Sequence, residues 1–449
     1  RILMEGLGGS GGKTVSFVMD QLLVKLKNEG WTKNRLPEGW QFVHIDVPGA
    51  ADGLGAGLAE SVQLQGGTYI GLAQTADSYV QVKTAIEGNL EAQNPSDLSY
   101  LARWEPDKSA NSIALSGGAG SYRAVGRVVT LAKASQIRAS LSTVMDRLNS
   151  MEARGDCREA GSLLKSKGSG LEEEPPLVLM VSSLSGGSGA SMVLDVADLL
   201  RSFGDSTFDS EHIAAFLYTG DVFKALDLFS AAPGSVATMS ELINSTFKIG
   251  LPWTQKEWSR IGVKTAVPSS LGRGPLMIVP VGGVVNGVPF GKGPTDVYRG
   301  FAGMIAPIFH DINIQEDFYN YSMVNFQGEA EEAPDNTGFA KDIISEKPYL
   351  AHFSGWGSAT LSMGRDRYVE YSAQRIARAA VETLVKGHVD GAVTSGNKTP
   401  LQAIADYADQ FYPLFWKMFD PAQNDGNVVL DAAAYVDAAF PKKVRIRIA

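Results

Sequence analysis

Three short glycine-rich segments contain the residue types that can bind a phosphate group. They read GLGGSGGK at residues 6–13, SGGAGS at residues 116–121 and SGGSGAS at residues 185–191. With so little side-chain bulk, their backbone N–H groups can turn toward an anion, and the helix expected after each segment adds its positive N-terminal end. The alternative for any one segment is a tight turn that binds nothing.

The third segment lies within the strand–loop–helix pattern around which the chain is organised. Residues 177–181 form an unbroken apolar run, residues 182–191 are rich in serine and glycine, and residues 192–200 have the spacing of an amphipathic helix. This order predicts a buried strand, a tight loop and a helix. Further runs predict strands at residues 40–46, 212–218 and 274–281, and helices at residues 75–88, 236–247 and 296–311.

The first segment permits two nucleotide-binding interpretations of its own. GKT at residues 12–14 fits the end of a Walker A loop, but Leu7 occupies the position of its first glycine, so the motif fails by one residue. GLGGSG at residues 6–11 matches the dinucleotide fingerprint, and Asp46 at the end of a predicted strand could hold ribose hydroxyls. An NAD(P)-dependent oxidoreductase with a Rossmann domain is therefore an alternative, although it leaves the other two segments without a role.

Together, the three segments resemble the phosphate loops of the tubulin/FtsZ superfamily, most of all those of its bacterial tubulin-like domain family. Residues 6–15 follow the FtsZ pattern GVGGGGGNAV, with Ser10 for one glycine and Lys13 for asparagine. Residues 118–127 follow the run G-A-G-x-x-R-x-x-G-R that recurs in the bacterial family. Residues 185–191 follow the signature G-G-G-T-G-S-G, with Ser188 in the threonine position and Ser191 in that of the last glycine.

The resemblance covers residues 1–311 and implies an α/β fold, namely a tubulin/FtsZ-like nucleotide-binding domain with a mostly parallel sheet. Within this domain, residues 151–176 are charged, rich in glycine and serine, and closed by two prolines. We expect them to form a mobile insertion. Residues 312–449 would form a smaller C-terminal α+β domain.

The implied ligand is GTP or GDP with Mg²⁺, in a protein that can self-associate head to tail. Asp296 stands in the helical turn that reads guanine in the superfamily, and Tyr298 could stack on the base. The alternative for Asp296 is an ordinary first-turn acid that the helix dipole favours. The residues that the resemblance places at the nucleotide are Gly8, Gly9, Ser10, Gly11, Gly12, Lys13, Asp46, Gly117, Gly118, Ala119, Gly120, Ser121, Gly186, Gly187, Ser188, Gly189, Ala190, Ser191, Asp296 and Tyr298.

Hydrolysis of GTP in this superfamily uses a carboxylate that the next subunit brings to the attacking water. FtsZ has the motif N-x-D-x-x-D at that place. Here Asn313 is present but Gln315 replaces the first acid, so Glu316 and Asp317 are the candidate catalytic residues. A solvated acidic turn is the alternative. The sequence therefore allows either a GTPase with a shared site or a nucleotide-binding scaffold without turnover.

Composition limits the classes of function. A net charge of −9 over 449 residues argues against a nucleic-acid-binding surface and favours a cytoplasmic protein. One cysteine, Cys157, excludes a disulfide framework and a cysteine-based zinc site, and the five histidines show no metal-ligand spacing. No apolar run reaches membrane-spanning length. We therefore expect guanine nucleotide and further copies of the chain as partners, and neither nucleic acid nor a membrane span.

Overall fold

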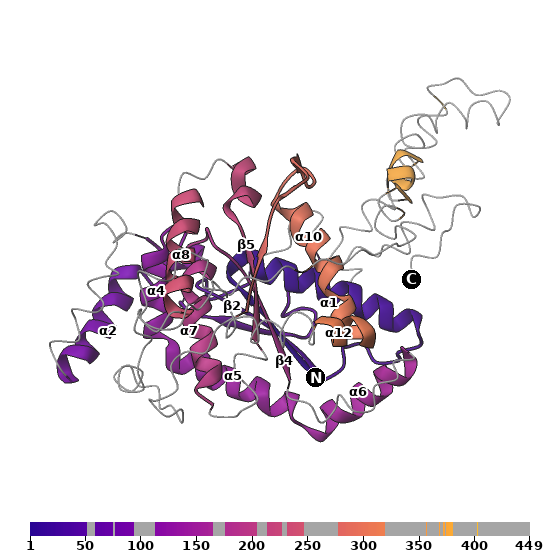
Figure 1. Ribbon diagram of the computed structural model, residues 1–449, viewed down its shortest axis with the longest axis horizontal. Helices are drawn as coiled ribbons and strands as arrows, with labels where there is room; N and C mark the ends of the chain where they lie inside the picture. The colour runs from indigo at the N-terminus through magenta and orange to yellow at the C-terminus, as the bar shows by residue number, and fades with distance from the viewer. Residues whose placement is uncertain are drawn as a thin grey trace, which may run out of the picture. The chain divides into compact units, whose positions relative to one another are not determined.

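A computed structural model describes the chain in several ranges (Figure 1). They are residues 1–51, 59–74, 77–93, 113–164, 176–203, 213–226, 231–246 and 277–318, with Trp356 and a few positions between 368 and 402. The chain divides into two units, Arg1–Thr360 and Leu361–Ala449, and nearly all of the described residues belong to the first. The C-terminal domain expected over residues 312–449 lies almost entirely outside the described residues and stays a prediction.

A six-stranded parallel sheet forms the centre of the first unit (Figure 1). Its strand order is β3-β2-β1-β4-β5-β6, and each of these pairings is parallel. The four central strands are buried along their whole length, as expected for parallel strands with helices on both faces. The strands are β1 (Ile2–Leu7), β2 (Trp40–Asp46), β3 (Thr68–Gly71), β4 (Leu177–Ser183), β5 (Ile213–Tyr218) and β6 (Met277–Val281), with a separate antiparallel pair β7 (Val284–Val285) and β8 (Val288–Pro289).

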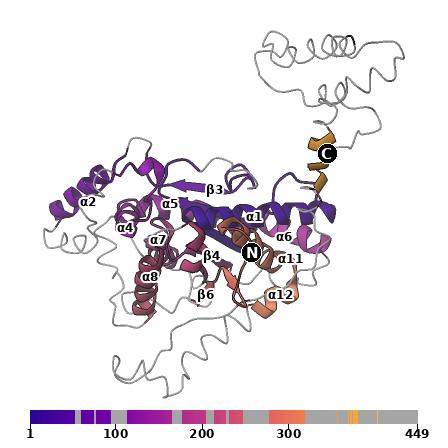
Figure 2. The ribbon, with the colours of Figure 1, turned by 90° about the horizontal axis from the view of Figure 1, so that it is seen from above.

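Helices cover both faces of the sheet. Along β1, Leu3 and Leu7 enter one hydrophobic cluster while Ile2 and Met4 enter the other, because successive side chains of a strand point to opposite faces. Helices α2, α4, α5 and α7 pack on the first face, and α1, α10 and α11 on the second (Figure 2). The helices are α1 (Gly8–Asn28), α2 (Tyr79–Gln93), α4 (Arg123–Ala132), α5 (Ala134–Leu148), α6 (Met151–Leu163), α7 (Gly189–Arg201), α8 (Ala231–Thr246), α10 (Pro294–Ile305), α11 (Pro307–His310) and α12 (Ile312–Asp317), with short 3-10 turns at Leu115–Gly117 and Gly220–Leu226.

The strand order creates a topological switch point between β1 and β4. From β1 the chain proceeds to β2 and β3 on one side, and it continues with β4, β5 and β6 on the other. In open parallel sheets, ligands bind outside the carboxyl ends of the strands at such a point. The first glycine-rich segment follows β1 and the third follows β4, so both lie at the switch point.

The first half of the expected mobile insertion is helical. Met151–Leu163 form α6, and the Ser150 hydroxyl oxygen caps this helix by accepting a hydrogen bond from the N–H of Ala153 at 3.0 Å. Residues 165–175, which carry the proline-rich end of the expected insertion, lie outside the described residues. Residues 151–163 are therefore helical, and the mobility of residues 151–176 stays a prediction.

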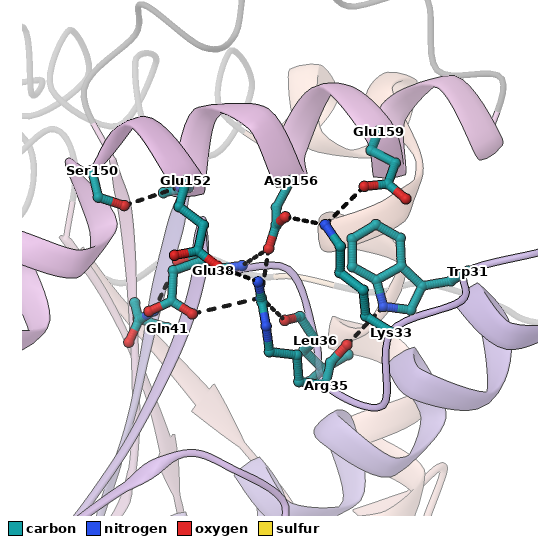
Figure 3. Close-up of polar contacts among 11 residues, drawn as sticks. Trp31, Lys33, Arg35, Leu36, Glu38, Gln41, Ser150, Glu152, Asp156 and Glu159 are labelled. Carbon is teal, nitrogen blue, oxygen red and sulfur yellow. Dashed lines mark hydrogen bonds and ion pairs between the residues drawn. The ribbon is translucent and has the colours of Figure 1, made fainter.

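Asp156 holds α6 against the segment before β2 (Figure 3). It is buried, and its carboxylate accepts hydrogen bonds from Lys33 Nζ and Arg35 Nη1, both at 2.5 Å, and from the N–H of Glu38 at 2.9 Å. Burial alone would raise the pKa of Asp156, but these hydrogen bonds outweigh burial and hold the pKa below its ordinary value. Asp156, in a segment expected to be mobile, thus finds partners 121 and 123 residues earlier in the chain.

The helix expected over residues 296–311 is divided in two. Helix α10 ends at Ile305 and α11 begins at Pro307, which has no N–H to donate to the preceding turn. The acidic stretch that follows forms the short helix α12 rather than a loop. Asp311 caps this helix, because its Oδ1 accepts hydrogen bonds from the N–H groups of Asn313 at 3.0 Å and Ile314 at 3.4 Å.

Candidate functional site

The first and third glycine-rich segments touch where β1 and β4 end. These strands pair in register with Gly6 opposite Val181, so their carboxyl ends lie side by side. A Cβ atom on Gly8 would lie 2.6 Å from the amide nitrogen of Gly189, and a Cβ atom on Gly189 would collide with the carbonyl oxygen of Leu7. Both positions need glycine because two backbones approach each other closely.

The second glycine-rich segment packs against the third. The N–H of Gly187 donates a hydrogen bond to the carbonyl oxygen of Gly120 at 3.0 Å. A Cβ atom on Gly187 would lie 2.9 Å from the carbonyl oxygen of Ala119, and one on Gly126 of α4 would lie 3.0 Å from the carbonyl carbon of Gly187. The three segments, which are far apart in the sequence, thus form one backbone surface at the switch point.

Packing does not explain every glycine of this surface. Gly118 has a φ of +91° and Gly120 a φ of +55°, in the range that favours glycine. A Cβ atom on Gly117 would meet nothing within 4 Å, and one on Gly186 would meet only the Ser183 hydroxyl oxygen, at 3.2 Å. The open positions, rather than the closely packed ones, are where a ligand can approach the backbone.

The first segment forms the opening turns of a helix instead of a loop. Helix α1 begins at Gly8, directly after β1 ends at Leu7. A Cβ atom on Gly11 would collide with the backbone of β4, and one on Gly12 would collide with the His44 ring of β2. These two glycines therefore allow α1 to pack closely on the sheet, which leaves Ser10 and Lys13 as the half-buried side chains of these turns.

Tyr298 is buried against α1 and does not present an open ring face. It is 5% exposed, its hydroxyl forms a hydrogen bond with the Ser10 hydroxyl at 3.1 Å, and its ring centroid lies 5.0 Å from that of Tyr218. Burial raises the pKa of Tyr298 to about 12. The Tyr218 hydroxyl in turn forms a hydrogen bond with that of Thr14 at 2.7 Å. These hydroxyls join α1, β5 and α10, and this arrangement gives no support to the base stacking expected of Tyr298.

Two further predicted residues are carboxylates that accept local hydrogen bonds. Asp46, buried at the carboxyl end of β2, accepts one from the N–H of Val47 at 2.7 Å, and its Oδ2 lies 3.7 Å from His44 Nε2. Asp296, in the first turn of α10, accepts one from the N–H of Lys292 at 2.7 Å and so fixes the turn before the helix. Contacts of either residue with a nucleotide stay predictions.

The serines of the third segment surround the start of α7. Ser188 precedes the helix, and Ala190 and Ser191 lie buried in its first turn. The Ser191 hydroxyl donates to the carbonyl oxygen of Ser188 at 2.7 Å and faces Gly126 of α4. Ser191, which replaces the last glycine of the superfamily signature, therefore packs between α7 and α4. Ser121 of the second segment is exposed.

Glu316 and Asp317 are exposed at the end of α12. This helix directly follows α11, whose Phe309 packs on Trp40, the first residue of β2, with ring centroids 5.5 Å apart. Trp40 marks the amino end of its strand, whereas the glycine-rich segments lie at the carboxyl ends. For either acid to act at a phosphate held there, it would have to come from a neighbouring subunit.

Two ion pairs beside the third segment were not predicted from the sequence. Arg127 Nε of α4 lies 2.7 Å from Asp195 Oδ2 of α7, and the two side chains are 5% and 0% exposed. Arg123, one turn earlier on α4, pairs through Nη2 with Glu241 Oε2 of α8 at 2.5 Å. An aspartate within the apolar run 192–200 was the available signal, because a charge is rarely buried without a partner.

The region that holds all three glycine-rich segments matches a known protein family. A family model described as tubulin like matches residues 3–260, more than half of the chain. The chain belongs to the tubulin-like family. No curated protein and no solved structure matches it. Membership confirms the predicted relationship to the tubulin/FtsZ superfamily, and the parallel sheet with helices on both faces confirms the α/β character of the tubulin-like domain.

The described ranges contain neither an evident metal site nor an evident membrane-spanning helix. Within them, no group of three or more Asp, Glu, His or Cys side chains is arranged to hold a metal ion. None of the helices described in the structure is both long enough and apolar enough to cross a bilayer.

Proposed function

We propose that this tubulin-like protein binds a guanine nucleotide, GTP or GDP, outside the carboxyl ends of β1 and β4. The observation that carries the proposal is the meeting of three glycine-rich segments, from distant parts of the sequence, at one switch point. Close packing accounts for several of their glycines but leaves others with open space beside the backbone. An uncrowded backbone at the carboxyl ends of parallel strands, next to helix N-termini, suits the phosphates of a nucleotide.

The proposed phosphate contacts are the positions with room for a ligand. A Cβ atom would meet nothing at Gly117 and only ordinary contacts at Gly118, and at Gly186 it would meet only the Ser183 hydroxyl oxygen, at 3.2 Å. Lys13 supplies a positive charge from the first turns of α1. Mg²⁺ commonly binds through substrate phosphates with one or two protein carboxylates, and we assign Asp46 of β2 to that role. When bound, the ion would neutralise part of the phosphate charge.

For the base, we propose that Asp296 accepts the N1 and N2 hydrogens of guanine. An ionised carboxylate has about four acceptor sites, so the hydrogen bond from Lys292 leaves room for two more. In the Asp296→Asn variant the amide presents donors where guanine also has them, whereas xanthine has a carbonyl at C2. We therefore expect this variant to bind GTP on the order of tenfold more weakly and to gain affinity for xanthosine triphosphate. Unchanged discrimination would leave Asp296 only its turn-fixing role.

The most direct test of the proposal identifies the ligand itself. The purified protein is denatured, and any released nucleotide is identified by chromatography and mass spectrometry. Guanine nucleotide supports the proposal. Released NAD(P) would favour the oxidoreductase alternative, and an adenine nucleotide would favour the Walker-type interpretation of Lys13.

A glycine substitution then tests the site. Gly117→Val fills an open position, so labelled GTP should no longer bind while the melting temperature of the free protein changes little. Gly155→Val on α6, which is equally open but lies outside the glycine-rich segments, is the matched control and should leave binding intact. Wild-type affinity in Gly117→Val would contradict the site. Gly187→Val is a poorer test, because its side chain would collide with the second segment and disturb the fold there.

Head-to-tail self-association is the second part of the proposal. Glu316 and Asp317 are exposed on α12, away from the phosphate surface, so only another copy could bring them to it. GTP turnover per subunit should then rise with protein concentration, and replacing both acids with alanine should remove turnover without loss of binding. Turnover per subunit that stays constant down to monomer concentrations would contradict a shared site. Binding without turnover at any concentration would indicate a scaffold.

A further inference from the structure

Arg123 stands at the level of the third glycine-rich segment. It is the first residue of α4, and this helix packs alongside α7, with Gly126 against the backbone of Gly187 and Arg127 paired with Asp195. Residues three and four apart share one face of a helix, so Arg123 lies on this same face. Arg123 lies one helical turn nearer than Arg127 to the carboxyl ends of the strands. The third segment begins at these ends.

The contacts of Arg123 agree with this placement. A Cβ atom on Gly234 of α8 would lie 3.8 Å from Arg123 Cδ and 3.6 Å from the carbonyl oxygen of Ser185, the first residue of the third segment. The stem of Arg123 therefore lies in the angle between the glycine-rich segments and α8. Its Nη2 is 2.5 Å from Glu241 Oε2, and the side chains of Arg123 and Glu241 are 11% and 31% exposed.

We infer that Arg123 is a specificity-determining residue that binds the terminal phosphate of a nucleoside triphosphate and exchanges Glu241 for it. This inference rests on the proposed nucleotide site. Asp296, the proposed base contact, begins α10 on one face of the sheet, whereas the second segment and α4 lie on the other. A nucleotide whose base lies at Asp296 and whose phosphate chain crosses the switch point would bring its terminal phosphate to Arg123.

Arg123 should bind the terminal phosphate more strongly than it binds Glu241. A guanidinium group binds carboxylate and phosphate oxygens through the same planar pair of donors. The terminal phosphate brings more negative charge than one carboxylate, and Glu241 is partly exposed, so water can solvate it once Arg123 leaves. A diphosphate lacks the group that Arg123 would meet, so the pair with Glu241 would stay intact.

The test compares affinities for GDP and for a non-hydrolysable GTP analogue by calorimetry. Arg123→Gln should weaken binding of the analogue by roughly tenfold to a hundredfold, the range of one lost charge-assisted hydrogen bond, and change GDP binding little. Arg123→Lys should recover part of the loss. Glu241→Gln removes the competing carboxylate and should strengthen binding of the analogue alone. Arg138→Gln is the control, because this arginine binds Ser202 at the far end of α7.

The outcomes separate this inference from the proposed function. If the wild type binds neither nucleotide, both fall together. If it binds both and Arg123→Gln keeps the wild-type ratio of affinities, only the inference is overturned. Equal losses for both nucleotides, or a lower melting temperature of the free protein with no change in the ratio, would show that Arg123 and Glu241 merely tie α4 to α8. Should Arg123→Gln fail to fold, Arg123→Lys and Glu241→Gln still give opposite shifts in the ratio.

Discussion

Glu5 provides the most exacting test of the physical reasoning. It lies in the middle of β1 with Val43 and Met180 opposite it on the neighbouring strands. It is 0% exposed, and neither carboxyl oxygen has a hydrogen-bond partner among the described residues. Burial raises the pKa of Glu5 from 4.5 to about 8. The folded protein therefore keeps this side chain protonated and neutral at pH 7, whereas the unfolded chain ionises it.

The sign and size of the effect follow from linkage. Between pH 4.5 and about 8 the folded state binds one proton more than the unfolded state, so the free energy of unfolding falls as pH rises. At about 1.4 kcal/mol per pH unit, the loss reaches roughly 3 kcal/mol at pH 7. Glu5→Gln has nearly the same shape and cannot ionise, so this loss should disappear. The variant should match the wild type near pH 4.5 and be more stable by about 3 kcal/mol at pH 7.

Urea unfolding of the wild type and the variant at several pH values measures this difference directly. Glu60→Gln is the control, because Glu60 is an exposed glutamate. Its substitution should not reproduce the gain in stability expected of Glu5→Gln at pH 7. A stability difference for Glu5→Gln that is independent of pH, or a variant that is less stable than the wild type at pH 8, would refute the account of Glu5 as a buried neutral acid.

Three further substitutions test the surroundings of the site. Gly118→Ala places a side chain at a φ of +91° and a ψ of −175°, so thermal unfolding should show a loss of about 1–3 kcal/mol, and an unchanged melting temperature would contradict this conformation. Asp195→Asn leaves Arg127 buried without its carboxylate and should cost about 3–5 kcal/mol in urea, whereas a loss below 1 kcal/mol would mean that the pair is solvated. Tyr298→Phe keeps the ring but loses the hydrogen bond to Ser10, so the free energy of unfolding should fall by about 1 kcal/mol. A large loss of nucleotide affinity instead would indicate that Tyr298 contacts the nucleotide.

Several features were predictable from local sequence. The apolar runs and the glycine-rich segments after them predicted strands followed directly by helices, as at β1 and α1 or β4 and α7. Such patterns are short-range: side-chain periodicity and backbone freedom are set within a few residues. The resemblance to the superfamily, which the family match confirms, also came from these local segments.

Other features depended on which distant residues meet. Composition did not show that residues 151–163 form α6, or that Asp156 pairs with Lys33 and Arg35 across the fold. Likewise the sequence did not show that the Tyr298 hydroxyl reaches Ser10 of α1, and stacking of its ring on a base stays a prediction. A charge or a ring has the same sequence signature whether it is solvated or buried, so tertiary contacts alone distinguish the two.

Three segments of the sequence have backbones able to approach an anion, because glycine and serine carry almost no bulk there. How each of their glycines is used depends on tertiary packing. The pairing of β1 with β4 brings Gly8 against Gly189, and the packing of α4 on α7 brings Gly120 against Gly187, whereas Gly117 has open space beside it. The reason is geometric: how closely two backbones approach depends on the packing of strands and helices far apart in the sequence.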